Sequence, residues 1–210
     1  PRPVAAEQRA AVVDALRSET LPWGPTDPYG GGKNLGACAR LVLIAEELGE
    51  DEVAAARRAE LAAHLEAWLE GSNADALRTD ATWGGVVPSR GVVDPGADYG
   101  AGFYNDHHFH YGYFVYAAAV LAKGDAAWAA RWAPAVTHLI RDIANPSDAD
   151  ALYPPMRHKD WFVGHSWAGG LFPSASGRNQ ESTSEAVNAW YAIALFGEAT
   201  GNQRLALLGR

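Results

Sequence analysis

Acidic and imidazole side chains concentrate between residues 98 and 113, among several aromatic residues. As ordinary core this segment would be costly, because each buried polar group needs a partner. One interpretation makes Asn105 or Asp106 the N-cap of a helix that begins near His108, held by backbone N–H groups. That position is compatible with general-acid catalysis by Asp106 if aromatic neighbours raise the pKa of the carboxyl by desolvation.

A second acidic cluster spans residues 177–186 and contains Glu181 and Glu185. Ser182 and Glu185 match a capping box that opens a helix, which explains Glu185 without any catalysis. It does not explain Glu181. Two carboxylates four residues apart repel by a few tenths of a kcal/mol, roughly, and the positive end of a helix dipole tolerates such a pair. A purely structural role for both glutamates therefore stays open.

Together, Asp106 and the two glutamates suit glycoside hydrolysis. That reaction needs one protonated carboxyl for the leaving oxygen and one ionised carboxylate that attacks or activates water. A metal-dependent hydrolase using Asp106, His107 and His110 is the competing hypothesis. Only the two histidines have helical ligand spacing, and no matching His or Cys cluster occurs elsewhere, so we expect no metal.

A third segment, residues 160–171, places Trp161, His165 and Trp167 among small residues. Aromatic faces of this kind can stack on the C–H faces of sugar rings. They can equally form the packed inside of a loop. The composition alone does not separate a sugar-binding surface from loop packing.

The positioning elements are predicted to be helices. Apolar residues at three- and four-residue spacing, with Gly and Pro at the ends, predict helices over 5–19, 34–47, 51–69, 111–123, 125–143, 183–200 and from 203 onward. Two long loops, 72–105 and 146–182, separate them, with short strands expected at 83–87 and 91–93. Helix pairs with long loops at one end predict an all-α fold, an (α/α) toroid; an irregular helical bundle is the alternative.

The composition limits the class of partner. The chain has 210 residues, enough for one domain, and a formal charge of −8, which argues against nucleic acid or anionic lipid. Cys38 is the single cysteine, so no disulfide can form within the chain, and its apolar surroundings favour a buried thiol. No apolar run reaches the roughly 18 residues that a membrane helix needs.

Three motifs occur in the order seen in one family of enzymes. They are 104–113 (YNDHHFHYGY), 164–168 (GHSWA) and 179–186 (NQESTSEA). Together they resemble glycoside hydrolase family 81, the endo-β-1,3-glucanases or laminarinases. The segment from Pro28 to Lys33 is also similar to the stretch that opens the first substrate-lining helices of that family.

The resemblance implies inverting hydrolysis of internal β-1,3-glucosidic bonds without metal or organic cofactor. It implies that Asp106 is the general acid and Glu181 or Glu185 the general base, with a slight preference for Glu181. The residues expected to support or bind the substrate are Lys33, Tyr104, His107, His110, Tyr111, Trp161, His165 and Trp167. A non-catalytic β-glucan-binding helical module is the alternative function.

The family also implies a setting for the chain. Its members carry a β-sandwich domain before the helical barrel and further helices after the last motif. We therefore expect residues 1–210 to be a single helical catalytic domain, truncated at both ends. The expected partner is β-1,3-glucan, including laminarin, curdlan and cell-wall glucan, and the expected state is a secreted monomer.

Overall fold

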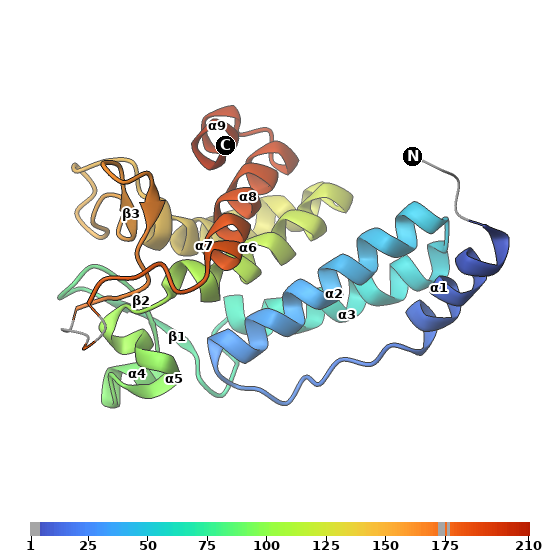
Figure 1. The fold of residues 1–210 in the computed structure, drawn as a ribbon, viewed down its shortest axis with the longest axis horizontal. Coiled ribbons are helices and arrows are strands. Elements are labelled where there is room, and N and C mark those ends of the chain that lie inside the picture. Colours follow the sequence, from blue (N-terminus) through green and yellow to red (C-terminus); the bar gives the residue numbers. More distant parts are fainter. Residues whose placement is uncertain (1–4, 172–174, 176) are drawn as a thin grey trace.

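Helical hairpins build the chain, whose computed structural model describes residues 5–171, 175 and 177–210 (Figure 1). Three hairpins occur in this part: α2 with α3, α6 with α7, and α8 with α9, while α1 packs on α2. The helix bounds are α1 Ala6–Ser18, α2 Pro28–Leu48, α3 Asp51–Leu69, α6 His107–Gly124, α7 Ala126–Ala144, α8 Thr183–Ala199 and α9 Gln203–Gly209.

The hairpin turns follow from local chemistry. Gly49 ends α2 in the left-handed region (φ 69°), which a glycine adopts without steric cost. Asp125 caps α7, and its carboxylate accepts hydrogen bonds from the backbone N–H groups of Ala127 and Trp128. Short turns of this kind force the two helices of each pair to run antiparallel.

The first helices of the three pairs, α2, α6 and α8, run in the same direction. Lys123 near the end of α6 pairs with Glu46 near the end of α2 at 3.3 Å, whereas Gly32 near the start of α2 lies against the carbonyl of His110. Tyr116 of α6 lies beside Tyr191 of α8, with ring centroids 6.4 Å apart. The N-terminal ends of these helices therefore share one end of the molecule, where the long loops also gather (Figure 1).

Small residues let these helices approach closely. A Cβ on Gly112 of α6 would lie 2.8 Å from the Cβ of Ala189 on α8, and a Cβ on Gly36 of α2 would lie 2.8 Å from the ring of Tyr113. Real Cβ atoms do not come this close, so glycine is required at both crossings. The helix α6 is buried along most of its length and forms the centre of the core.

The long loops contain short elements. Strand β1 (Leu77–Asp80) pairs antiparallel with β2 (Gly85–Pro88), and β3 (Lys159–Asp160) pairs antiparallel with β4 (His165–Ser166). Two short helices, α4 (Ser89–Val93) and α5 (Ala97–Gly100), and a 3-10 turn, η1 (Ala101–Phe103), follow β2.

The strand expected at 91–93 is wrong, because that segment is helical, and the strand expected at 83–87 lies at 85–88. The backbone N–H groups of Ser89 and Arg90 donate to the Ala76 carbonyl and the Asp75 carboxylate, at 2.9 and 2.7 Å. These bonds bend the chain after Pro88 away from an extended course. The strand partner of β2 therefore comes from the residues before it.

A buried charged cluster ties the loops to the core. The Nδ1 of His107 lies 2.6 Å from Asp142 Oδ2, the backbone N–H of Val86 donates to Asp142 Oδ1 at 3.0 Å, and Arg157 lies 3.4 Å from the same oxygen. Burial alone would raise the pKa of Asp142, but His107 and Arg157 hold this pKa below its usual range. Each buried charge thus has a partner, as stability requires.

Across the described residues, no helix is both long and apolar enough to cross a membrane.

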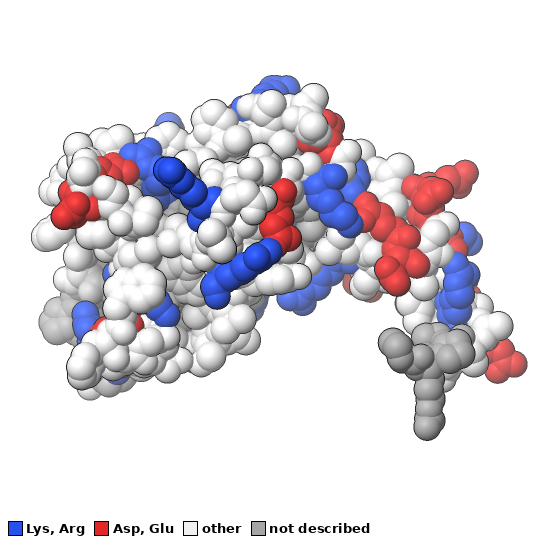
Figure 2. All heavy atoms as spheres, turned by 90° about the horizontal axis from the view of Figure 1, so that it is seen from above, with Lys and Arg blue, Asp and Glu red and all other residues white. Residues whose placement is uncertain are grey.

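Acidic side chains gather over the α1–α3 end of the face that Figure 2 shows, and fewer charges cover the end with the long loops. In this view the acidic side chains are therefore most concentrated over α1–α3.

Candidate active site

Asp106 occupies the N-cap position of α6 in an uncommon backbone conformation. Its φ is 59° and its ψ is 13°, in the left-handed region that few non-glycine residues adopt. Its backbone N–H donates to the Ala168 carbonyl at 3.0 Å. The side chain makes no capping hydrogen bond. The N-cap position is thus confirmed, but the carboxyl is not held by backbone N–H groups as expected.

The environment of Asp106 favours the protonated form. The residue is 8% exposed, and burial, followed by the nearby charges of Glu181 and Glu185, raises its pKa to about 7. Desolvation and like charges both disfavour a carboxylate. A carboxyl that keeps its proton near neutral pH is suited to protonating a leaving group.

The two glutamates differ in their surroundings. The phenol of Tyr113 donates a hydrogen bond to Glu185 Oε1 at 2.8 Å, and Glu185 is half-buried. Glu181 is exposed, has a positive φ of 57°, and forms no hydrogen bond or ion pair within the described part of the chain. The oxygen of Ser182 accepts from the Glu185 backbone N–H at 3.4 Å, so half of the expected capping box forms. The Glu185 side chain is engaged with Tyr113 instead.

Backbone hydrogen bonds bring these acids together from distant parts of the sequence. Asp106 N–H donates to the carbonyl of Ala168, and Ala168 N–H donates to the carbonyl of Asn179, both at 3.0 Å. Gly170 N–H donates to Asn105 Oδ1 at 2.7 Å. The segment around Ala168 therefore links the start of α6 to the residues just before α8. We call Asp106, Glu181 and Glu185 the acid site.

An aromatic and basic group lies beside the acid site. The Nζ of Lys33 is 4.4 Å from the ring centroid of Tyr29, and the exposed ring of Tyr99 packs edge-on against Tyr29 at 5.2 Å. A hydrogen bond with Tyr29 raises the pKa of Lys33, and the charge of Glu185 adds to this effect. We call Tyr29 and Tyr99 the tyrosine patch.

Sequence reasoning did not select Tyr29, Tyr99 or Tyr113. Tyr113 lies two helical turns after Asp106 on α6, and Tyr29 lies one turn before Lys33 on α2. These spacings place side chains on one helix face and could have indicated both tyrosines. Tyr99 has no such signal, because its position depends on a loop.

Tyr104, His107 and Tyr111 lie inside the protein, with at most 1% of each residue exposed. The Tyr104 hydroxyl donates to Asp80 Oδ2, and the Tyr111 hydroxyl donates to the Val86 carbonyl. The two ring nitrogens of His107 form hydrogen bonds with Asp142 and the Ala101 carbonyl. Substrate contact by these three residues stays a prediction, and in this structure their side chains are packed in the interior. His110 is 2% exposed, and its ring lies 5.0 Å from that of Tyr29.

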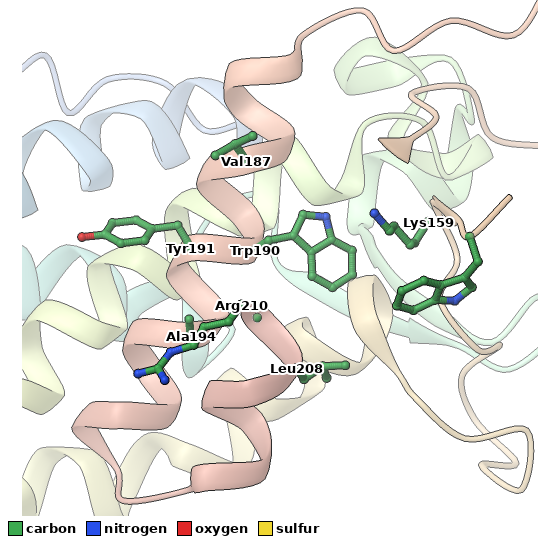
Figure 3. A pocket seen from close by; sticks show the side chains of 9 residues that line it. Lys159, Val187, Trp190, Tyr191, Ala194, Leu208 and Arg210 are labelled. Atoms are coloured by element: carbon green, nitrogen blue, oxygen red, sulfur yellow. The ribbon is translucent and has the colours of Figure 1, made fainter. Parts of the chain in front are cut away.

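Trp167 is linked to the acid site through the neighbouring Ala168, whose carbonyl accepts from Asp106, whereas Trp161 lines a separate pocket. Trp167 precedes Ala168, and its ring packs edge-on against His165 at 4.4 Å. Trp161 is 70% exposed and lines a pocket of about 470 Å³ between the β3–β4 hairpin, α8 and α9 (Figure 3). Val187, Trp190, Tyr191 and Ala194 line the same pocket from α8. None of its lining residues belongs to the acid site.

The metal hypothesis depends on His107 as a ligand. Both ring nitrogens of His107 are engaged, with Asp142 and with the Ala101 carbonyl at 2.7 Å. Among the residues that the structure describes, no group of three His, Cys, Asp or Glu side chains is arranged to hold a metal ion.

Paired helices that carry three carboxyl groups near one end are compatible with a helical glycoside hydrolase, because that reaction uses a pair of carboxyl groups. Comparison with known proteins agrees with this class. The family model described as "Glycosyl hydrolase family 81 C-terminal domain" matches residues 9–210. The chain belongs to glycosyl hydrolase family 81.

Relatives and a solved structure support this assignment. The "Glucan endo-1,3-beta-D-glucosidase" of Glycine max is 44% identical over 199 residues, which cover 94% of this chain and 30% of the relative. The protein of the same name from Acetivibrio thermocellus is 44% identical over 190 residues, covering 87% of this chain and 24% of the relative. The chain therefore spans less than a third of the length of these relatives.

A family 81 glycoside hydrolase from Clostridium thermocellum has a similar structure. The TM-score is 0.76 at 36% identity, and the match covers 96% of this chain and 28% of that chain. The match confirms the all-α, (α/α) toroid class that the helix pairs predict.

Proposed function

We propose that the protein hydrolyses internal β-1,3-glucosidic bonds of a glucan with inversion of the anomeric carbon. Asp106 is the general acid, Glu181 the general base, and Glu185 orients the substrate or the attacking water. The observation that carries this proposal is the burial of the Asp106 carboxyl near Glu181 and Glu185, which raises its pKa to about 7. The names of the relatives supply the substrate class.

The acid role follows from the protonation state of Asp106. At neutral or slightly acidic pH the carboxyl holds a proton that it can give to the glycosidic oxygen as the bond breaks. The charges of the two glutamates add to burial in raising the pKa of Asp106, so they help the acid to keep its proton. Inversion requires the carboxyl of Asp106 and that of the base to stand about 6.5–9.5 Å apart, which leaves room for a water molecule.

The choice of Glu181 as base rests on the different engagement of the two glutamates. Glu185 accepts the hydrogen bond of Tyr113, which fixes the position of the bonded oxygen. Glu181 is exposed and unengaged in the described residues, and it is the first of the two charges that act on Asp106. Glu181 therefore has the freedom to hold and deprotonate a water molecule.

The polymeric substrate suggests the setting in which the protein works. A glucan chain cannot cross a membrane, so we propose a secreted protein that acts as a monomer on extracellular or cell-wall β-1,3-glucan. One relative, from Schizosaccharomyces pombe, is named "Primary septum glucan endo-1,3-beta-D-glucosidase" and is 40% identical over 181 residues, 83% of this chain and 18% of the relative.

The test compares turnover with binding in the natural protein that carries this sequence. Asp106→Asn keeps the size of the side chain but removes the transferable proton, so laminarin hydrolysis falls by about 10³-fold or more while laminarin binding persists. Exposed Asp94→Asn is the matched control, and its turnover stays unchanged. Binding without turnover in the unmodified protein would instead indicate a glucan-binding module, and activity that a chelator abolishes would indicate a metal hydrolase.

A further inference from the structure

Two buried carboxyl groups lie side by side behind the tyrosine patch. Asp75, just before β1, is 1% exposed, and the side chain of Asp98 in α5 is 3% exposed. The carboxyl groups are within hydrogen-bonding reach of each other. One oxygen of each, Asp75 Oδ2 and Asp98 Oδ2, has no donor among the described residues. Two ionised carboxylates in this position would repel without compensation.

The surrounding charges do not neutralise this pair. The backbone N–H of Arg90 in α4 donates to Asp75 Oδ1 at 2.7 Å, but the mostly exposed guanidinium of Arg90 stays 3.9 Å from Asp98 Oδ1. Asp27 at the start of α2 adds a further negative charge, and the charge of Asp98 also acts on the phenol of Tyr111, which donates to the Val86 carbonyl. Burial first, and then Asp75, raises the pKa of Asp98 to about 7.

The pair anchors an unusual stretch of backbone. Asp98, Tyr99 and Gly100 all have a positive φ, at 51°, 61° and 85°. Such a conformation is unfavourable for tyrosine and persists only when neighbouring contacts hold it. Asn105 supplies one of these contacts, because its Nδ2 donates to the Tyr99 carbonyl at 3.2 Å. The buried Asp98 carboxyl fixes the other end of the stretch.

This backbone presents the ring of Tyr99 to solvent next to the acid site. The residue is 66% exposed, and its ring lies 5.2 Å from Tyr29 and 6.3 Å from His110. In Figure 1, α5 lies close to the first turn of α2, which carries Tyr29. An exposed aromatic face held on a rigid backbone is the surface on which the C–H face of a pyranose ring stacks.

We propose that Asp75 and Asp98 share one proton, and that this carboxyl–carboxylate hydrogen bond holds Tyr99 in place as a stacking surface for a sugar ring of the substrate. The proton resides on Asp98 and is donated to Asp75. The shared proton is independent of the proposed function, whereas the role of Tyr99 rests on it. Loss of the proton at higher pH leaves two buried charges, which loosens the 98–100 backbone and the ring of Tyr99.

The shared proton is tested without substrate. In the natural protein, the side-chain carboxyl carbon of Asp98, followed by NMR, should titrate near pH 7, well above the ordinary range of about 4. Asp98→Asn keeps a donor for Asp75 and tolerates a positive φ. Its Tm relative to the parent should therefore rise by several degrees between about pH 5 and pH 8. Asp75→Asn should do the same, and the double variant should add little more.

The Asp94→Asn variant is the control for these measurements, because Asp94 is exposed in the same segment. Its Tm difference from the parent should not change with pH. An Asp98 carbon that titrates in the ordinary carboxyl range, or an Asp98→Asn profile as flat as that of Asp94→Asn, overturns the shared proton. A Tm that Ca²⁺ raises in the parent but not in Asp98→Asn overturns it as well, because the pair would then be a cation site.

The role of Tyr99 is tested by binding of a β-1,3-linked oligosaccharide in an Asp106→Asn background, which removes turnover and the titration of Asp106. Affinity should weaken about threefold or more from pH 6 to pH 8, should lose this pH dependence in Asp98→Asn, and should fall by a similar factor in Tyr99→Ala. Binding that ignores both pH and Tyr99→Ala contradicts this role. If no oligosaccharide binds at any pH, the proposed function fails, while the NMR and Tm results still decide the shared proton.

Discussion

The phenol of Tyr113 on α6 donates a 2.8 Å hydrogen bond to Glu185 on α8, which joins residues 72 positions apart. Burial first, and then this bond, raises the pKa of Tyr113 well above its usual value, so the phenol remains a donor at every working pH. A glutamate that depends on a tyrosine donor is positioned by the packing of α6 against α8. The separation of the acids is thus set by how these two helices meet.

Removing the Tyr113 hydroxyl should release Glu185. A hydrogen bond to a charged group contributes about 1.5–3 kcal/mol, so Tyr113→Phe is expected to lower kcat for laminarin by roughly 10- to 100-fold. KM should change much less. The control is Tyr116→Phe, one turn further along α6, where the ring packs near Tyr191 and no glutamate is in contact. Equal activities of the two variants would contradict a positioning role for Tyr113.

Asp106 should cost stability at high pH. Its pKa in the folded protein, about 7, lies above the unfolded value of about 3.8, so the folded state binds the proton more tightly. The resulting stabilisation is fully present below about pH 4 and is lost as pH rises through about 7. Asp106→Asn is therefore expected to raise Tm at pH 8 by roughly 4 °C or more relative to its effect at pH 4.

The pH dependence of Tm also tests what raises the pKa of Asp106. In Glu181→Gln, one of the charges that raise the pKa of Asp106 is absent, so the alkaline loss of stability should move to lower pH. Burial is the larger cause and remains. A difference profile between Asp106→Asn and its parent that shows no pH dependence would mean that Asp106 is not desolvated.

The contact between α6 and α8 should tolerate no added methyl group. A Cβ at position 112 would lie 2.8 Å from the Cβ and 2.9 Å from the Cα of Ala189, and therefore pushes the two helices apart. Gly112→Ala is expected to destabilise the protein by about 1–3 kcal/mol, measured by urea unfolding. It should also lower kcat by more than this stability loss explains, because the acids move with the helices. Gly24→Ala is the control, since a Cβ there meets no atom within 4 Å.

Helix ends were predicted well where signals near them in the sequence set them, and poorly where contacts with distant residues set them. Helix α3 lies at 51–69 as expected, because its apolar spacing and the flanking Gly71 are local signals. Helix α2 begins at Pro28 instead of residue 34, since its glycine-rich start resembles a turn. Those glycines are needed because a Cβ on Gly32 would lie 3.0 Å from the carbonyl of His110, 78 residues away.

The acidic residues of the site could be selected from the sequence, but the contacts around them could not. Residue types alone selected Asp106, Glu181 and Glu185, since few core positions need carboxyl groups at helix starts. The burial of Tyr104 and His107 was not predictable, because their partners Asp80 and Asp142 lie elsewhere in the sequence. The roles of Tyr113 and Tyr99 depend on equally distant contacts.

Two stacked histidines should make the fold sensitive to acid. His108 and His158 are buried, with ring centroids 4.4 Å apart, and His108 has no hydrogen-bond partner in the described residues. Burial first, and then nearby histidines, lowers the pKa of both, that of His158 to about 3. For a lowered histidine pKa, stability is present above about 6.5 and is lost as pH falls toward 3.

The urea midpoint is therefore expected to fall between about pH 6.5 and pH 4, and His158→Gln should reduce that fall. The glutamine amide can still donate to the Trp167 carbonyl, which His158 contacts at 3.0 Å, but it does not titrate. His165→Gln, at a half-buried position in the same hairpin, should leave the fall unchanged. An acid transition that is the same in both variants would exclude the histidine pair as its cause.

The stereochemistry of the first product tests the arrangement of the acids most directly. Proton NMR can follow the anomer that the natural protein releases from a β-1,3-linked oligosaccharide before mutarotation. Direct displacement by water held at Glu181, opposite the protonated Asp106, produces the α-anomer first. If the β-anomer appears first, a carboxylate has attacked the sugar, and the proposed separation of the acids is wrong.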